Sequence, residues 1–278
     1  MSDFDIKKID EMDAMDGGEQ LGKFRRARAE LGVESFGVAV IDLVPNADGY
    51  PDHSHPEDGQ EEVYTVISGA GEIEVGGERH PLHPGTMARV GPGTKRKIWP
   101  GEEGMRIVPI GGRRGHAYEP GPNGAPMGLP EGQPEVSDEE LSDGDFTVKA
   151  IDDMEGVYFG AFKRARAELG AEAFGIQVID MPPNADAYPE HDHTDGGQEE
   201  LYYLISGSAE IEMEGERHPI DPGTMVRIGP AVTRKVWTGD EPIRLVIVGA
   251  TPGEAYEVLP DAITELGQPD PMAQQGQG

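Results

Sequence analysis

Two histidines and a glutamate stand at a spacing that suits metal binding. In the stretch YPDHSHPEDGQEEVYTVISG, one residue separates His53 from His55, and the acidic pair Glu61 and Glu62 follows them at the start of an apolar run. Because side chains alternate along a strand, both imidazoles are expected on one face, where a carboxylate of a neighbouring strand can meet them. Two imidazoles and one carboxylate with open coordination positions suit Fe, Mn, Ni or Zn. The stretch therefore predicts a site for a divalent transition metal.

The same stretch occurs a second time in the chain, as YPEHDHTDGGQEELYYLISG, with His191, His193 and Glu200 in the corresponding positions. From Phe24 to Tyr118 the second copy follows at a constant offset of 138 residues, without insertion or deletion. Such a repeat indicates two similar domains. The repetition of both histidines and of the glutamate argues against ordinary polar loop residues and predicts two equivalent sites.

Each copy contains a series of short strands with sharp turns. Segments such as GEIEVGGERHPL alternate apolar and polar residues around a glycine turn, which is typical of a hairpin. The chain has 40 glycines and 24 prolines, which suits many tight turns. This pattern predicts an all-β fold with a closed sheet or sandwich in each half. One segment, FRRARAELG from Phe24 to Gly32, fits a strand or a helix equally well, so its type is left open.

The repeat also sets the expected domain boundaries. We expect an N-terminal barrel at 1–118, an acidic linker rich in proline and glycine at 119–145, a C-terminal barrel at 146–262, and a disordered tail at 263–278. Within the linker, Ser137 is a candidate N-cap for one short helix.

The composition of the chain argues against some classes of binding partner. The net charge is -30, from 53 acidic and 23 basic residues, which argues against nucleic acid and against anionic membrane surfaces. The absence of cysteine excludes disulfides, thiolate metal sites and cysteine nucleophiles. Since no stretch has the pattern of a signal peptide or a transmembrane helix, a cytoplasmic location is expected. Sheet edges and outward-facing tryptophans are compatible with a homodimer.

These motifs resemble those of the cupin superfamily, and two copies in one chain resemble a bicupin. The first cupin motif has His-x-His, then a glutamate, six further residues and a glycine, as at Glu62 and Gly69 here, with a longer gap after the second histidine. The resemblance implies two tandem jelly-roll β-barrels, each a double-stranded β-helix. In the second motif, HPGTMARVGPGTKRKIW and its copy, the family's histidine falls on Arg96 and Arg234. Arginine does not bind metal, because its guanidinium stays protonated.

Two roles are open for these arginines. A guanidinium beside a metal ion can hold a substrate carboxylate, and the tyrosines on the glutamate's strand face can bind a ligand or simply line the barrel. Alternatively, each arginine forms an ion pair with the glutamate of its own half and replaces the metal. The candidate catalytic residues are Arg96, Arg234, Tyr64 and Tyr202.

Two functions from different classes therefore remain. The first is a metal-dependent protein that binds or transforms a small anionic organic molecule in the barrel, by oxygenase-type (dioxygenase-like) or isomerase chemistry if it is an enzyme. The second is a metal-free binding or structural bicupin, in which arginine, glutamate and histidine form a polar network. The sequence favours the first and leaves the metal, the substrate and the reaction open.

Overall fold

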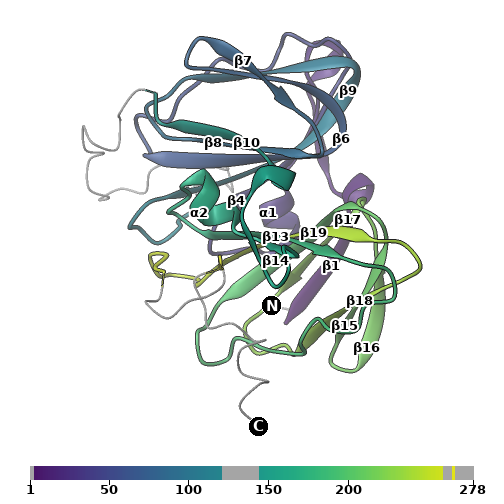
Figure 1. Cartoon of the computed structure of the whole chain (residues 1–278). Helices are drawn as coiled ribbons and strands as arrows, with labels where there is room; N and C mark the ends of the chain where they lie inside the picture. Colours follow the sequence, from purple (N-terminus) through teal and green to yellow (C-terminus); the bar gives the residue numbers. More distant parts are fainter. Residues whose placement is uncertain (1–2, 121–143, 259–264, 267–278) are drawn as a thin grey trace.

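The computed structural model describes residues 3–120, 144–258 and 265–266 and contains two β-barrels stacked on each other (Figure 1). Every strand pair is antiparallel, and the only α-helices among the described residues are two of five residues each. The predicted all-β class with jelly-roll barrels is confirmed. No helix in the described part of the chain is long and apolar enough to span a membrane.

The elements of the first half begin with a strand that precedes those of the first barrel. They are β1 (Phe4–Lys8), η1 (Ile9–Glu11), β2 (Ala14–Asp16), η2 (Gly18–Gln20), β3 (Gly22–Arg25), α1 (Ala27–Leu31), β4 (Gly37–Val38), β5 (Val40–Leu43), β6 (Gln60–Val75), β7 (Glu78–Leu82), β8 (Thr86–Val90) and β9 (Arg96–Arg113). Both faces of β6 are buried over its first eight residues, because one face lines the barrel and the other packs against the second half.

The second half repeats this order. Its elements are β10 (Phe146–Ala150), η4 (Ile151–Asp153), β11 (Gly156–Val157), β12 (Phe162–Lys163), α2 (Ala165–Leu169), β13 (Gly175–Met181), β14 (Glu199–Ser206), β15 (Ala209–Met213), β16 (Glu216–Ile220), β17 (Thr224–Ile228), β18 (Arg234–Thr238) and β19 (Ile243–Ala250). The segment of undecided type is a strand followed by a short helix in both copies. Gly32 and Gly170 end these helices in the left-handed conformation, with φ of 71° and 76°.

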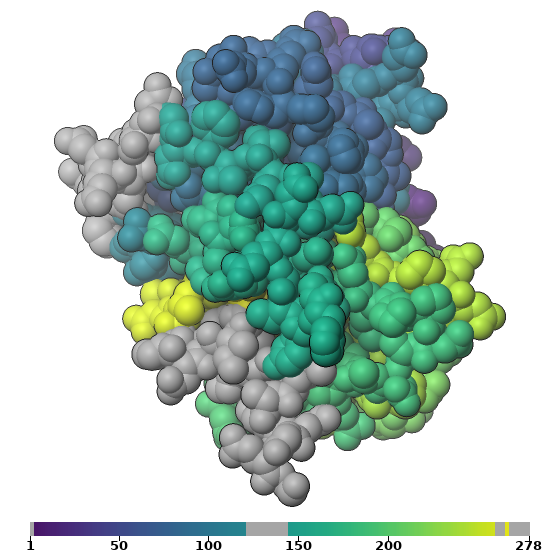
Figure 2. Space-filling model, in the orientation of Figure 1, coloured from purple at the N-terminus to yellow at the C-terminus, as the bar shows by residue number. Residues whose placement is uncertain are grey.

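Each half lends its first strand to the sheet of the other half. Strand β1 pairs with β17, so that Phe4 lies opposite Ile228, and β10 pairs with β8, so that Phe146 lies opposite Val90. In Figure 1, β1 accordingly runs through the lower barrel, although it belongs to the first half of the sequence. In the space-filling view of Figure 2, the start of the second half, in teal, lies across the junction of the two barrels. The division at 118 and 146 remains a prediction for the domains, but the sheets themselves are interlocked.

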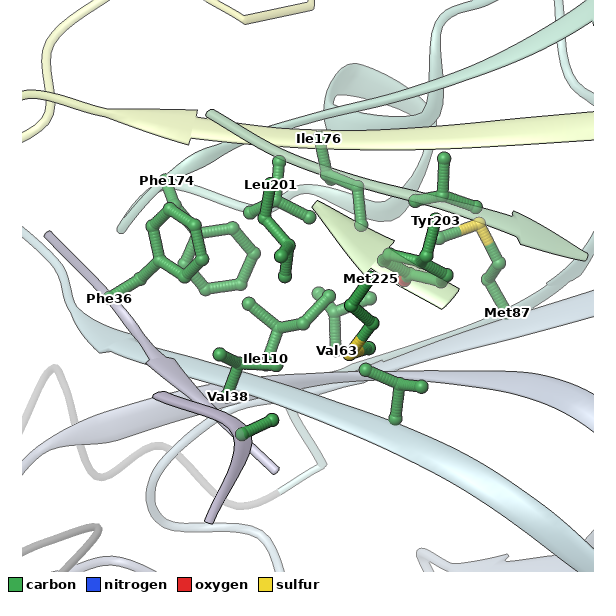
Figure 3. Close-up of a cluster of buried hydrophobic side chains, with 14 of the residues drawn as sticks. Phe36, Val38, Val63, Met87, Ile110, Phe174, Ile176, Leu201, Tyr203 and Met225 are labelled. Atoms are coloured by element: carbon green, nitrogen blue, oxygen red, sulfur yellow. The ribbon is translucent and has the colours of Figure 1, made fainter. Parts of the chain in front are cut away.

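A hydrophobic core fills the space between the barrels, in addition to one core inside each barrel (Figure 3). Equivalent residues of the two halves meet in it: the rings of Phe36 and Phe174 are 6.4 Å apart, and Thr65 Oγ1 lies 2.9 Å from Tyr203 Oη. Each of these pairs is separated by the repeat offset, which places them beside a local two-fold axis. Helices α1 and α2 also lie between the barrels (Figure 1) and contribute their leucines to this core.

Buried carboxylates also form hydrogen bonds between the two halves. Glu199 Oε1 accepts hydrogen bonds from the backbone N–H and the hydroxyl of Ser35, both at 2.7 Å, across the junction. Glu61 makes the reciprocal contact, accepting from the N–H of Ala173 at 2.7 Å. Each carboxylate also pairs with an arginine of its own barrel. The first glutamate of each Glu-Glu pair therefore serves the contact between the halves, which leaves the second one for the barrel interior.

Two predictions concern segments at the edges of the described residues. The proposed helix at Ser137 lies outside them. The predicted disordered tail, 263–278, remains a prediction and lies outside the described residues except for Glu265 and Leu266, which are 3% and 6% exposed and pack against the second barrel. Apolar packing of Leu266 and hydrogen bonds to Glu265 and to the Leu266 carbonyl anchor these two residues.

Candidate metal centre

The two histidines of the first site are held on an extended segment that joins β5 to β6. His53 forms an isolated antiparallel bridge with Arg96 at the start of β9, with N–H to carbonyl distances of 3.1 and 2.9 Å. His55 donates its backbone N–H to the carbonyl of Pro92 at 2.8 Å. These bonds anchor the segment against the barrel, and the two imidazole rings lie 5.2 Å apart on the same side. The predicted shared face is what the structure shows.

Glu62 is the third residue of β6 and points into the same space. Its Oε2 lies 3.5 Å from His53 Nε2 and 3.3 Å from His55 Nε2. In the second barrel, His193 Nε2 lies 3.2 Å from Glu200 Oε1. In each barrel the two imidazoles and the carboxylate offer ligand atoms that all lie within 4.8 Å of one another. The structure therefore brings together both predicted groups of ligands.

The second nitrogen of each imidazole shows which atom faces the site. His53 Nδ1 lies 3.0 Å from the carbonyl oxygen of Pro51, and His191 Nδ1 lies 3.1 Å from that of Pro189. A carbonyl only accepts, so in each ring Nδ1 carries the proton and the lone pair of Nε2 is directed at the site. Histidines that bind metals commonly have such a partner on the other nitrogen. His55 has a carboxylate partner instead, with Nδ1 at 3.3 Å from an oxygen of Asp58.

Several buried atoms at the two sites lack a hydrogen bond. Within the described chain, His55 Nε2, His193 Nε2 and Glu200 Oε1 are buried and have no hydrogen-bond partner. A buried polar atom without a partner costs about 1–3 kcal/mol. These are the atoms that a metal ion would engage, and nitrogen and oxygen donors in this number suit a divalent transition metal. The residues present therefore fit the predicted metal.

The arginines lie against the glutamates. Arg96 is fully buried and donates to Glu62 Oε2 from Nη2 at 2.6 Å and from Nε at 3.1 Å, while its Nη1 donates to the carbonyl of Thr94 at 3.0 Å. Arg234 forms the same ion pair with Glu200. The ion pair of the second alternative is therefore present in both barrels, while replacement of the metal by it remains a prediction. A role for either arginine as a substrate anchor remains a prediction.

The tyrosines also contact the glutamates. Tyr64 donates its hydroxyl hydrogen to Glu62, and Tyr202 donates to Glu200 at 2.8 Å. Burial and the neighbouring carboxylate charge raise the pKa of both tyrosines well above the ordinary value, so that they stay protonated. They therefore position the carboxylates through these hydrogen bonds, and direct contact with a ligand remains a prediction.

The charge states suit a cation ligand set. Burial acts to raise the pKa of Glu62, but the charge of Arg96 and the two histidines outweigh it and hold that pKa well below its usual range. The pKa of Glu200 is lowered in the same way, mainly by the charge of Arg234. Burial, with the charge of Arg234, lowers the pKa of His191 to about 4. At neutral pH the carboxylates are thus ionised and His191 is neutral, as metal binding requires. For His55, burial acts to lower the pKa, but Asp58 and Glu62 outweigh it and raise that pKa, which favours the protonated ring in the absence of a cation.

A cavity of about 310 Å³ opens beside the first site. His53, Gln60 and Glu62 form its polar end, and the remaining walls are mostly apolar. Neither arginine is among the lining residues. Gln60 was not predicted from the sequence, although it recurs as Gln198, two positions before the glutamate and on the same strand face, which was a usable signal. The main apolar wall residues are Leu21, Phe24, Val38, Ala39, Ile41, Tyr50 and Pro109.

Two interlocked antiparallel barrels, each with a histidine pair and a glutamate facing its interior, define a duplicated all-β metal-site scaffold. The Cupin domain model matches residues 39–111 and 177–249, which together make up more than half of the chain. The chain belongs to the cupin family and is a bicupin.

Solved structures show the same fold at low sequence identity. The protein Ylba from E. coli is 16% identical, with a TM-score of 0.63 over 92% of this chain and 93% of that one. The oxalate decarboxylase of Lactobacillus farciminis, solved as a formate complex, is 13% identical, with a TM-score of 0.60 over 90% and 87%. A putative glyoxylate induced protein from Pseudomonas aeruginosa is 14% identical, with a TM-score of 0.53 over 81% and 77%. No curated protein matches the sequence.

Proposed function

We propose that this bicupin is a metal-dependent protein whose first barrel binds a small organic molecule. His53, His55 and Glu62 hold a divalent transition metal, and the adjoining cavity takes the molecule. The observation that carries the proposal is the convergence of two imidazoles and one ionised carboxylate, whose ligand atoms lie within 4.8 Å of one another, with the buried His55 Nε2 at 3.3 Å from Glu62 Oε2. Two imidazoles and a carboxylate that meet in this way suit a divalent transition metal.

The cavity suggests the kind of molecule. Its walls are apolar and its polar end is formed by the ligand residues, so a suitable molecule has an apolar body and one charged or polar head. An anionic oxygen is the head that a divalent cation attracts, in line with the small anionic molecule expected from the sequence. The formate complex of the oxalate decarboxylase shows a small carboxylate bound by a protein of similar fold.

The residues around the site have separate tasks in this proposal. A bound metal would act as a Lewis acid that polarises an oxygen of the substrate. Glu62 supplies a negative ligand, while Arg96 and Tyr64 hold its carboxylate in place by hydrogen bonds. The apolar walls exclude water from the reacting atoms. An oxygenase or isomerase reaction is compatible with three protein ligands and open coordination positions.

A metal-free polar network is the second candidate, and the Arg96–Glu62 and Arg234–Glu200 ion pairs favour it. In that case the barrel binds its ligand without a metal. Each guanidinium already places a positive charge beside its glutamate, so a metal cation would gain less electrostatic energy by binding there. The two candidate functions differ in the amount of metal bound per chain, which can be measured directly.

The test is metal content by elemental mass spectrometry on untagged protein, before and after addition of Fe(II), Mn(II), Ni(II) or Zn(II). We expect about two equivalents per chain, one for each histidine pair with its glutamate. The His55→Ala variant should lose one equivalent, and a second loss should follow when His193→Ala is added. His116→Ala is a matched control, because this histidine lies outside both sites. No stoichiometric metal in the unmodified chain would refute the proposal in favour of the metal-free network.

A further inference from the structure

The two barrels differ where the first one has its cavity. Gly37 and Gln60 line that cavity in the first barrel. Their counterparts by the repeat offset, Gly175 and Gln198, are instead in contact with Leu266 from the far end of the chain. Residues that line a cavity in the first half thus correspond to residues that contact the backbone of Leu266 in the second half.

Leu266 is buried among residues that correspond to the walls of the first cavity. It is 6% exposed and belongs to the core of the second barrel, together with Ile179 and Tyr188. These two residues are the counterparts of Ile41 and Tyr50, which line the cavity of the first barrel. Leu266 therefore belongs to the same apolar cluster as the counterparts of two cavity walls of the first barrel.

Polar contacts hold this leucine in place. Its carbonyl oxygen accepts a hydrogen bond from Gln198 Nε2 at 2.7 Å. The preceding residue, Glu265, accepts from Arg164 Nε at 3.1 Å and from the backbone N–H of Ala167 at 2.7 Å. Leu266 is thus fixed on both sides, by its own carbonyl and by the carboxylate next to it. These contacts are specific, unlike the general burial of an apolar side chain.

The occupied barrel also has an altered polar end. In the first barrel, Gln60 Nε2 donates to Glu62 Oε1 at 3.4 Å. In the second barrel, the amide of Gln198 is used by Leu266, and Glu200 Oε1 has no hydrogen-bond partner among the described residues. Occupation by Leu266 thus draws a cavity-lining amide away from the glutamate of the site.

The sequence contains this anchor in the second copy alone. Gly-Gln-Pro occurs after both barrels, at 132–134 and at 267–269. It is preceded by Pro130 and Glu131 in the first case, and by Glu265 and Leu266 in the second. An apolar residue that can enter a barrel thus stands directly before this motif only after the second barrel.

We infer that the second barrel is a latent ligand site, which Leu266 of the same chain occupies. In the full chain only the first barrel is then free to bind a ligand. When Leu266 is displaced, the second barrel takes the same class of molecule, one with an apolar body and a head directed at the histidines. The inference rests on the proposed function for the class of ligand, but not for the presence of metal.

The test uses fluorobenzene, a neutral apolar probe that needs no metal, observed by ¹⁹F NMR in titrations of the metal-free protein. The unmodified chain should bind one equivalent, and Leu266→Ala should bind two. Gly175→Ala is a second route to the same end, because a Cβ at this position would lie 2.5 Å from the Cα of Leu266 and displace it. Ala39→Leu fills the first cavity, so adding it to Leu266→Ala should leave one equivalent, which assigns each signal to a barrel.

Two results would overturn the inference. One is a second bound equivalent in the unmodified chain, which would mean that Leu266 does not block the barrel. The other is an unchanged stoichiometry in both Leu266→Ala and Gly175→Ala, with circular dichroism showing that both variants are folded. Failure of the metal proposal would appear separately, as absent metal with the fluorobenzene stoichiometries intact.

Discussion

The buried ion pair between Arg96 and Glu62 gives the sharpest prediction about stability. Replacing Arg96 by methionine keeps much of the side-chain volume but removes the positive charge that lies 2.6 Å from the carboxylate. The guanidinium is fully buried and the Glu62 side chain is 8% exposed, so water cannot replace the lost partner. The remaining carboxylate is then a buried charge without its main counter-charge.

Breaking a buried pair from one side typically costs about 3–5 kcal/mol. The matched control is Lys95→Met at the neighbouring position, where the ammonium lies 3.7 Å from Asp52 and both side chains are more than half exposed. An exposed pair of this kind contributes about 0–1 kcal/mol. The two neighbouring substitutions should therefore differ by at least 2 kcal/mol.

The assay is urea unfolding followed by far-ultraviolet circular dichroism, which reports the free energy of unfolding of each variant. The double variant Arg96→Met with Glu62→Gln should recover part of the loss, because it removes both charges. Adding Mn(II) should stabilise Arg96→Met more than it stabilises the unmodified chain, since the cation restores a positive charge beside Glu62. A loss of unfolding free energy in Arg96→Met no larger than that in Lys95→Met would contradict this prediction. Simple additivity of the effects of Arg96→Met and Glu62→Gln would contradict it as well.

Three further predictions follow from the contacts between and within the halves. Glu199→Ala removes a carboxylate that accepts three hydrogen bonds from the first half and pairs with Arg227, so it should cost about 3 kcal/mol or more in urea unfolding, against little change for the exposed Glu103→Ala. The pKa values of Glu62 and Glu200 in the folded protein lie below the ordinary value of 4.5. Their contribution to the free energy of unfolding is therefore complete above about pH 4.5 and is lost as the pH falls below it. A free energy of unfolding that does not change between pH 5 and pH 3 would contradict this prediction. Ile6→Asp, in the exchanged strand β1, should lower the hydrogen-exchange protection of β17 in the second barrel and leave β8 in the first barrel unchanged, whereas protection lost only in the first barrel would argue against the exchange in solution.

Much of the candidate site could be predicted from local spacing. His53 and His55 share a face because side chains alternate along an extended chain, while Glu62 was chosen over Glu61 by the resemblance to the cupin motif, which fixes the spacing from the glutamate to the glycine that follows. Glu61 lies on the opposite face of the strand, and in the structure it accepts a hydrogen bond from the second half of the chain. The ion pair of Arg96 was one of two open alternatives, since contact between residues 34 positions apart depends on how the strands of the barrel close.

The sequence by itself determined the repeat, the all-β class and the residues that surround each candidate metal site, because these follow from periodicity and from short spacings. Only the tertiary structure decided which sheet each first strand joins. The patch FDIKKI was recognised as part of the repeat, but β-pairing is compatible with either half and its own sequence does not specify the partner. The same holds for Leu266, whose insertion into the second barrel depends on a cavity shaped by residues far away in the sequence. Local patterns thus identify the chemistry available in each half, while long-range packing makes the two halves different.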